Sequence, residues 1–158
     1  MAAGEEVSAI LKDDSQTVFW GEKIAAALKK GGTVYLHGEL GAGKTTLCRG
    51  ILRAYGHQGA VKSPTYTILE PYELDCVKVY HFDLYRMLDP EEWEYLGVDE
   101  YFSPESICLV EWPEKGANYL PVSDVNITLL YHENGRKMIV SASSNRGVEI
   151  LQELKTAE

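Results

Sequence analysis

Residues 38–45 read GELGAGKT, and this stretch matches the pattern GxxxxGK[ST] in full. Glycines let the backbone turn tightly and approach a phosphate, while successive N–H groups and the N-terminus of a following helix attract the anion. Lys44 is expected to reach the β- and γ-phosphates of a nucleotide, and the Thr45 hydroxyl to ligate Mg²⁺. A glycine-rich turn that merely precedes a helix is the competing interpretation. The pattern predicts a phosphate loop with nucleotide contacts from Glu39, Leu40, Gly41, Ala42, Gly43, Lys44, Thr45 and Thr46.

The segments on either side of the loop have the context that a phosphate loop requires. Residues 33–37 (TVYLH) are β-prone, and residues 46–55 repeat apolar side chains at helical spacing. An earlier helix is expected from about Gln16 to Lys30, with Ser15 as its N-cap and Gly31-Gly32 ending it. The order strand, loop, helix therefore favours the phosphate-binding interpretation.

Strand-like and helix-like segments alternate beyond the loop helix. An acidic helix is expected to begin near Asp89-Pro90, and Asn134-Gly135 is a strong hairpin signal, so part of the sheet should be antiparallel. The expected fold class is α/β: a P-loop NTPase-like three-layer sandwich with a mixed, mainly parallel central sheet. A length of 158 residues suits one domain over residues 1–158. The predicted later strands cover residues 65–70, 78–82, 107–110, 125–132 and 137–142.

Composition and charge narrow the range of functions. The chain is 45% hydrophobic and 25% charged, and no apolar run approaches the ~18–20 residues that span a bilayer. The N-terminal MAAGEE lacks the basic start and apolar stretch of a secretory signal, which favours a cytoplasmic location without membrane association. A net charge of −9 without a basic stripe opposes direct binding to RNA or DNA. The widely spaced Cys48, Cys76 and Cys108 are typical of reduced structural thiols.

Two carboxylates follow apolar strand segments and are candidate partners of the loop. Asp83 ends VYHFD and Glu111 ends ICLVE, so each is expected at the sheet edge where α/β proteins bind ligands. Mg²⁺ on a P-loop nucleotide needs a strand-end carboxylate, and hydrolysis also needs a group that orients water. Both acids are therefore catalytic candidates, as is Lys44, and candidate metal ligands, as is Thr45. The alternative for either acid is that it is a solvated loop residue without a role in the site. Asp99-Glu100 follows a helical segment and is expected on a solvated face.

Three other sequence features each allow a structural and a functional interpretation. Ser63-Pro64-Thr65 suits an ordinary Ser-Pro turn, although it also lies where switch loops contact a γ-phosphate. His81 should share a facing with Asp83 and is either a core hydrogen bonder or a site residue. Trp112 follows Glu111 and either packs in the core or reports nucleotide occupancy.

The loop by itself does not determine the nucleotide or the reaction. Guanine-specific switches usually carry an Asn-Lys-x-Asp tetrad, which does not occur in this sequence, so ATP is favoured. An ATPase, a small-molecule kinase and a pure ATP-binding module are the competing hypotheses. A kinase normally needs an arginine-bearing lid, and the only suitable stretch, residues 86–102, is acidic and carries no arginine after Arg86.

Four motifs together resemble the bacterial TsaE family, also called YjeE. They are HGELGAGKTT at 37–46, SPTYT at 63–67, HFDLYR at 81–86 and VEWPEKG at 110–116. Their order, their spacing and the total length fit that family. SPTYT together with HFDLYR is more specific than the glycine-rich loop alone.

The resemblance implies a small ATPase needed to form threonylcarbamoyladenosine at position 37 of tRNAs that read codons starting with A. Its ligands would be ATP and Mg²⁺, and its protein partners would be TsaD and TsaB. Contact with tRNA would come only through those partners.

The resemblance also assigns roles to residues of this chain. Lys44 and Thr45 become contacts to the nucleotide and Mg²⁺, Glu111 a carboxylate on the Mg²⁺ side, and Asp83 a second acid required for activity. Ser63-Pro64-Thr65 becomes a switch-like segment, with Thr65 as a catalytic candidate. Further nucleotide contacts are implied around Leu11 to Asp14 and at Arg136.

Overall fold

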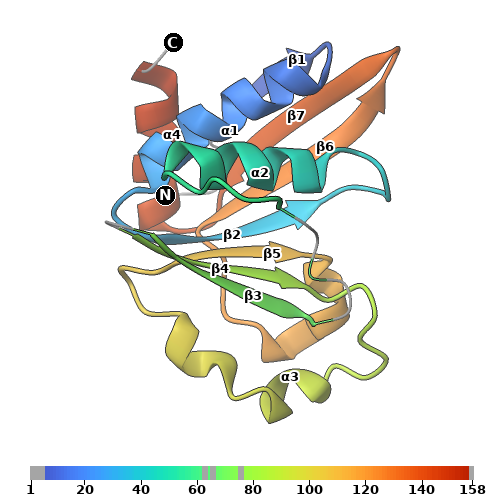
Figure 1. Ribbon diagram of the computed structural model, residues 1–158, viewed down its shortest axis with the longest axis vertical. Helices are drawn as coiled ribbons and strands as arrows, with labels where there is room; N and C mark the ends of the chain where they lie inside the picture. The colour runs from blue at the N-terminus through green and yellow to red at the C-terminus, as the bar shows by residue number, and fades with distance from the viewer. Residues whose placement is uncertain (1–5, 62–63, 65–66, 75–76, 157–158) are drawn as a thin grey trace.

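The computed structural model describes residues 6–61, 64, 67–74 and 77–156, and these residues build a seven-stranded sheet (Figure 1). The strands are β1 (Glu6–Leu11), β2 (Gly32–His37), β3 (Leu69–Leu74), β4 (Val77–Asp83), β5 (Ile107–Glu111), β6 (Val125–His132) and β7 (Gly135–Ala142). Their order across the sheet is β1-β7-β6-β2-β5-β4-β3. The predicted mixed sheet is confirmed.

Parallel pairing is confined to the middle of the sheet. The neighbours β6, β2, β5 and β4 run parallel, whereas β1 with β7, β7 with β6, and β3 with β4 pair antiparallel. The expectation of a mainly parallel sheet therefore holds for the centre and is only partly right for the whole. The central parallel strands are the ones that carry the candidate loop and acids.

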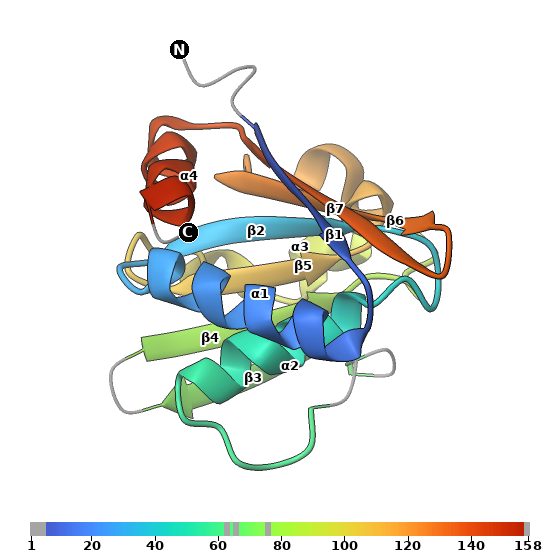
Figure 2. The ribbon, with the colours of Figure 1, turned by 90° about the horizontal axis from the view of Figure 1, so that it is seen from above.

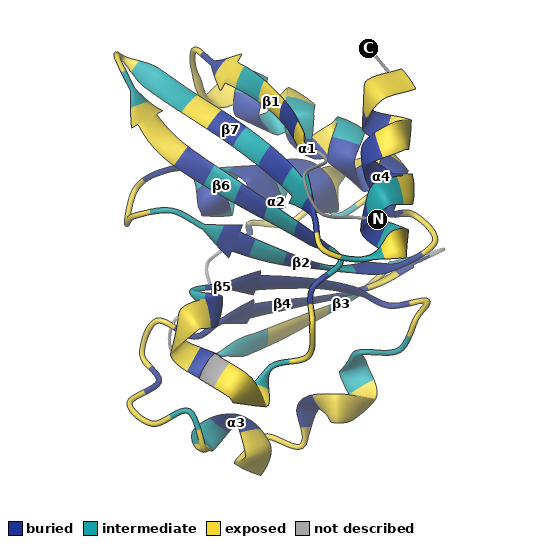
Figure 3. Ribbon diagram, turned by 180° about the vertical axis from the view of Figure 1, so that it is seen from behind, coloured by how far each residue is buried: buried dark blue, intermediate teal, exposed yellow. Residues whose placement is uncertain are grey.

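Helices cover both faces of the sheet, as expected for three layers. On one face lie α1 (Asp14–Leu28), α2 (Lys44–Ala54) and α4 (Asn145–Thr156), and from above α1 lies beside α2 with α4 next to it (Figure 2). The other face carries the short segments α3 (Glu92–Tyr95), η1 (Val98–Tyr101) and η2 (Pro113–Tyr119). Glu94 and Tyr95 of α3 are exposed, whereas the central strands β4 and β5 are almost wholly buried between the layers (Figure 3).

Each face has its own apolar cluster because side chains alternate along the strands. On β4, Val79 joins the cluster beneath α1, α2 and α4, whereas Phe82 joins the opposite cluster. The ring of Phe82 lies 5.3 Å from that of Trp93 in α3. β5 is buried along its whole length, which explains why its sequence reads as a continuous apolar run.

Glycines let α1 and α2 pack unusually close together. A Cβ at Gly50 would lie 2.6 Å from the Val18 carbonyl oxygen, and a Cβ at Gly21 would lie 2.8 Å from the Leu47 oxygen. Real Cβ atoms are not found that close to backbone, so both positions need glycine. α1 thus holds in place the helix that follows the phosphate loop.

The start of α1 corrects one prediction. Asp13, and not Ser15, is the N-cap: its carboxylate accepts a hydrogen bond from the Gln16 N–H at 3.1 Å. The Ser15 hydroxyl instead donates to Asp13 at 2.7 Å. A carboxylate next to several helix N–H groups is the stronger acceptor, so the cap lies two residues earlier than expected.

The predicted strand over 65–70 also begins later than expected. β3 starts at Leu69, because the chain turns first: the Ile68 N–H donates to the Pro64 carbonyl at 2.7 Å, and Ile68 has a φ of 70. Thr65 and Tyr66 lie outside the described residues.

The acidic helix that was predicted to begin near Asp89-Pro90 starts slightly later. It begins at Glu92, whose carboxylate accepts from the N–H groups of Leu88 and Asp89, both at 2.9 Å. The turn that precedes the helix is therefore held by the helix's own first acid. Asp99 and Glu100 are exposed, as predicted.

The predicted hairpin is present, with its turn shifted by one residue. The last pair is His132 with Gly135, so Glu133 and Asn134 form the turn, and Glu133 has a φ of 52. Gly135 begins β7, where a Cβ would lie 2.3 Å from the Leu11 carbonyl oxygen. Its glycine is needed for the approach of β1.

The short segments η1 and η2 were not predicted, and neither were the longer elements β1 and α4. Among the described residues β1 pairs only with β7, so its extended conformation depends on a distant strand. In α4 the buried Gly147, Ile150, Leu151 and Leu154 do have helical spacing, and Ser144 caps the helix by accepting from the Gly147 N–H at 2.9 Å. The helix continues to Thr156. No helix in the described part of the chain is long and apolar enough to cross a membrane.

Candidate functional site

The glycine-rich loop joins β2 to α2 and has the backbone shape of a phosphate cradle. Gly38, Gly41 and Gly43 have φ values of 154, 79 and 109, in the left-handed range that favours glycine. α2 begins at Lys44, directly after Gly43, so the positive end of its dipole faces the loop. The predicted order strand, loop, helix is confirmed.

The β6–β7 hairpin braces this loop through three successive carbonyl groups. The Tyr131 hydroxyl donates to the Leu40 oxygen at 2.7 Å. The Arg136 guanidinium donates to the oxygens of Gly41 and Ala42, each at 3.1 Å, and lies 4.4 Å from the centre of the Tyr131 ring. These contacts fix the loop from the side of its carbonyl oxygens. Arg136, which the family resemblance linked to the nucleotide, therefore contacts the loop itself.

Lys44 is folded back into the loop. Its ammonium donates to the Gly38 carbonyl and lies 3.9 Å from the centre of the Trp112 ring. Burial lowers the pKa of Lys44 below its ordinary value, while the carboxylates of Glu111 and Asp83 oppose that shift. The lysine charge is thus held in a poorly solvated position, where electrostatic contacts are strong.

The two predicted acids face the same cavity as the loop. Asp83 and Glu111 are register partners at the ends of the parallel strands β4 and β5, and each is only 3% exposed. The Asp83 carboxylate also accepts from the Tyr85 N–H at 3.0 Å. Together with the loop they line a cavity of about 260 Å³ whose walls include Lys44, Thr45, Thr46, Asp83 and Glu111.

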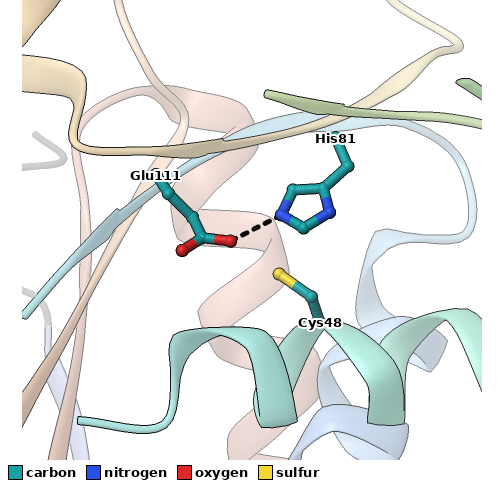
Figure 4. Close-up of side chains that lie close together, drawn as sticks. All are labelled: Cys48, His81 and Glu111. Carbon is teal, nitrogen blue, oxygen red and sulfur yellow. Dashed lines mark hydrogen bonds and ion pairs between the residues drawn. The ribbon is translucent and has the colours of Figure 1, made fainter. Parts of the chain in front are cut away.

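His81 lies behind these acids and contacts one of them directly. Its Nε2–H donates to Glu111 Oε2 at 2.6 Å, and the His81 side chain is completely buried (Figure 4). Burial disfavours the charged ring, but the neighbouring Cys48 sulfur and the Glu111 carboxylate outweigh burial and raise the pKa of His81 to about 10. Burial has the opposite effect on an acid, and it raises the pKa of the Cys48 thiol. The prediction of reduced structural thiols holds for Cys48 and Cys108, which are free and buried, while Cys76 lies outside the described residues.

Comparisons with known proteins identify the family of this chain. Residues 11–139 match the family model described as Threonylcarbamoyl adenosine biosynthesis protein TsaE. The tRNA threonylcarbamoyladenosine biosynthesis protein TsaE of Haemophilus influenzae is 45% identical over 152 residues, which cover 93% of this chain and 96% of that protein. The protein of the same name from Bacillus subtilis is 40% identical over 134 residues, 84% of either chain.

The chain belongs to the TsaE family. The fold agrees as well: the crystal structure of Bacillus subtilis YdiB is similar with a TM-score of 0.83 and 30% sequence identity, covering 97% of this chain and 96% of that chain. The resemblance read from the four sequence motifs is therefore confirmed at the level of the family.

The residues of this TsaE-family site are chemically suited to Mg²⁺. The Thr45 hydroxyl and the carboxylates of Asp83 and Glu111 line one cavity, and hard oxygen donors of this kind are the ligands that Mg²⁺ prefers. Lys44 adds a cation to the same wall, and a cation of this kind suits phosphate oxygens. The donor set therefore fits a nucleotide with its divalent cation.

Four other residues predicted at the site are not among the described residues that line the cavity. Leu11 is fully buried in β1, opposite Arg136 of β7, so its side chain belongs to the core. Glu39 is exposed and lines a neighbouring hollow with Trp112. Ser63 and Thr65 lie outside the described residues, and the catalytic role of Thr65 stays a prediction.

Sequence reasoning missed two tyrosines at the site. Tyr85 lines the cavity, and a signal was available, because it follows Asp83 by two residues within HFDLYR. Tyr131 braces the loop from β6, and no local pattern could have shown that contact. Trp112, left open between packing and reporting, lines the cavity and covers Lys44.

Proposed function

We propose that this chain binds ATP with Mg²⁺ and hydrolyses it in the formation of threonylcarbamoyladenosine at position 37 of tRNAs that read codons starting with A. The observation that carries the proposal is the convergence of Lys44, Thr45 and two strand-end acids on one cavity, in a member of the TsaE family. The names of the H. influenzae and B. subtilis relatives support the pathway.

Each element of the site has a role in this proposal. The loop N–H groups and Lys44 bind the phosphates, since oriented dipoles and a cation in a poorly solvated site favour anions. Thr45 and Glu111 would hold Mg²⁺, with Asp83 as a further ligand or as the group that orients water. When bound, Mg²⁺ supplies charge neutralisation on the β- and γ-phosphate oxygens.

The placement of residues 86–102 favours hydrolysis over the kinase alternative. Trp93 and Val98 of this segment are buried in the apolar cluster around Phe82, on the face of the sheet opposite to α2. A segment anchored there does not cover an acceptor in front of the phosphate loop. Within the described residues this segment therefore provides no lid over a second substrate, which supports water as the acceptor.

Partners complete the proposal. We infer that residues 1–158 form one P-loop domain and that this domain works with the proteins TsaD and TsaB. The chain would contact tRNA only through these two partners. The net charge of −9 supports indirect contact because the chain should repel an RNA backbone. Turnover by the chain alone should be slow, since a group supplied in trans can raise phosphoryl-transfer rates by ~10³–10⁵. The cytoplasmic location stays a prediction.

Phosphate release and tRNA retention test the proposal. Each is measured at physiological salt for the chain alone, for TsaD with TsaB, and for the full mixture with ATP and Mg²⁺. The proposal expects ATP binding by the chain alone, with turnover and tRNA retention that rise in the mixture. Fast turnover or submicromolar tRNA affinity of the chain alone would contradict partner dependence. Transfer of the γ-phosphoryl group to an added small molecule would instead favour the kinase.

A further inference from the structure

Three buried side chains from three different elements meet behind the cavity: Cys48 of α2, His81 of β4 and Glu111 of β5 (Figure 4). One ligand-type atom of each lies within 4.8 Å of the corresponding atoms of the other two. Cys48 is one helical turn beyond Lys44, and His81 is two residues before Asp83. The cluster therefore connects the loop helix with both strands that carry the acids.

The contact between His81 and Glu111 has the geometry of a hydrogen bond and not that of a shared metal ion. Nε2 and Oε2 are 2.6 Å apart, whereas two ligands about 2.0–2.2 Å from one tetrahedral zinc ion lie roughly 3.3–3.5 Å apart. A carboxylate only accepts, so the His81 nitrogen is the donor. The other ring nitrogen, Nδ1, has no hydrogen-bond partner among the described residues. Glu111 is thus the hydrogen-bond acceptor of this buried ring.

The bond leaves half of the Glu111 carboxylate for the cavity. Oε2 is bound to His81, while the other oxygen points away from the ring (Figure 4), and Glu111 contributes to the cavity wall. A glutamate side chain has several rotatable bonds and needs a fixed partner to keep one rotamer. His81 is a rigid ring, completely buried, and is well suited to that task.

We propose that His81 is a positioning residue that holds Glu111 in the orientation needed to accept Mg²⁺ with a nucleotide. The inference rests on the proposed function, because it assigns His81 to the support of that site's metal ligand. Outer partners that orient a metal ligand commonly change metal affinity by about 10–100-fold when they are removed. Cys48 completes the packing around the pair without being a ligand.

Calorimetry of ADP binding, with Mg²⁺ and with EDTA, tests the proposal on the whole chain. The ratio of the two affinities measures the coupling between Mg²⁺ and the nucleotide. His81→Leu removes the donor at similar size and should reduce this ratio by about 10-fold or more, with little change in EDTA. His81→Gln places an amide N–H near the former Nε2 and should restore most of the coupling. Cys48→Ala keeps the His81–Glu111 pair and should retain the wild-type ratio.

The outcomes separate this inference from the proposed function. Wild-type coupling in His81→Leu, or equal losses in the Leu and Gln variants, would overturn the positioning role. Loss of coupling in Cys48→Ala would indicate a metal bound by the cluster itself and would also overturn it. An absence of Mg²⁺ dependence in the wild-type chain would refute the proposed function, and the positioning role with it.

A direct measurement covers the case in which His81→Leu fails to fold. In the wild-type chain the His81 imidazole is observed by ¹⁵N–¹H NMR, without nucleotide. The Nε2–H signal should shift in Glu111→Gln, because the acceptor loses its charge while its size is kept. A signal that is unchanged in Glu111→Gln would overturn the contact on which the proposal stands.

Discussion

The phosphate loop and the pair of acids face one cavity, but they are built differently. The loop consists of consecutive residues, and its shape follows from glycines with positive φ at Gly38, Gly41 and Gly43. Asp83 and Glu111 come from separate strands and meet only because β4 and β5 pair in parallel with these two residues in register. The shape of the loop is therefore determined by consecutive residues, whereas the placement of the two acids depends on how the strands pair. The two halves should therefore fail differently when they are mutated.

The largest effect is expected for the acids, and it should fall on turnover. Asp83→Asn and Glu111→Gln keep size but remove charge beside the reacting phosphate, so partner-stimulated hydrolysis should drop by about 10²–10⁴-fold. ATP affinity measured in EDTA should change only a few-fold, because most of the metal-free affinity comes from the loop. Asp99→Asn, an exposed acid of η1, is the matched control. Wild-type rates in both site variants would remove the catalytic assignment.

The next effect is expected for the loop, and it should fall on binding. Lys44→Ala removes the cation that faces the phosphates, and one charged hydrogen bond of about 1.5–3 kcal/mol corresponds to roughly 10- to 100-fold weaker ATP binding. A calorimetric titration measures this loss, with the exposed Lys30→Ala as control. If Lys44→Ala keeps its ATP affinity while the Asp83 and Glu111 variants lose theirs, the acids and not the loop provide most of the binding.

This division also explains how much of the site could be predicted from sequence. Lys44 and Thr45 belong to a pattern of fixed spacing, so their places were predicted directly. Asp83 and Glu111 could be named because each ends an apolar strand, although only the register shows that they are opposite each other. The brace by Tyr131 and Arg136 joins residues far apart in the chain, and no local pattern contains that information.

The fold follows the same rule. β2, β5 and the β6–β7 strands were predicted within a few residues, because buried strands and a hairpin leave local signals. β1 was missed since its conformation depends on β7. The shift of the α1 cap to Asp13 came from a choice between two good capping residues two positions apart, which sequence alone does not resolve.

A substitution between α1 and α2 should lower the stability of the fold without changing nucleotide binding. Gly50→Ala introduces a Cβ that would lie 2.6 Å from the Val18 oxygen, and overpacking of this kind costs about 1–3 kcal/mol. Denaturant unfolding should show that loss, while nucleotide affinity at low temperature changes little. Ala54→Gly at the end of α2 is a control that changes helix propensity without a clash. Unchanged stability in Gly50→Ala would mean that α1 and α2 can separate at little cost.

The smallest effect is expected where Tyr131 and Arg136 of the β6–β7 hairpin contact the carbonyl groups of the loop. Tyr131→Phe removes one hydroxyl, and with it the 2.7 Å hydrogen bond to the Leu40 oxygen, while the ring can still pack under Arg136. One neutral hydrogen bond is worth about 0.5–1.5 kcal/mol, so ATP affinity should fall by roughly 2- to 10-fold if the bond holds the loop in its binding shape. Tyr95→Phe, 84% exposed on α3, is the matched control. A loss confined to thermal stability would show that the hairpin supports the fold only, and that the loop keeps its shape through its own glycines.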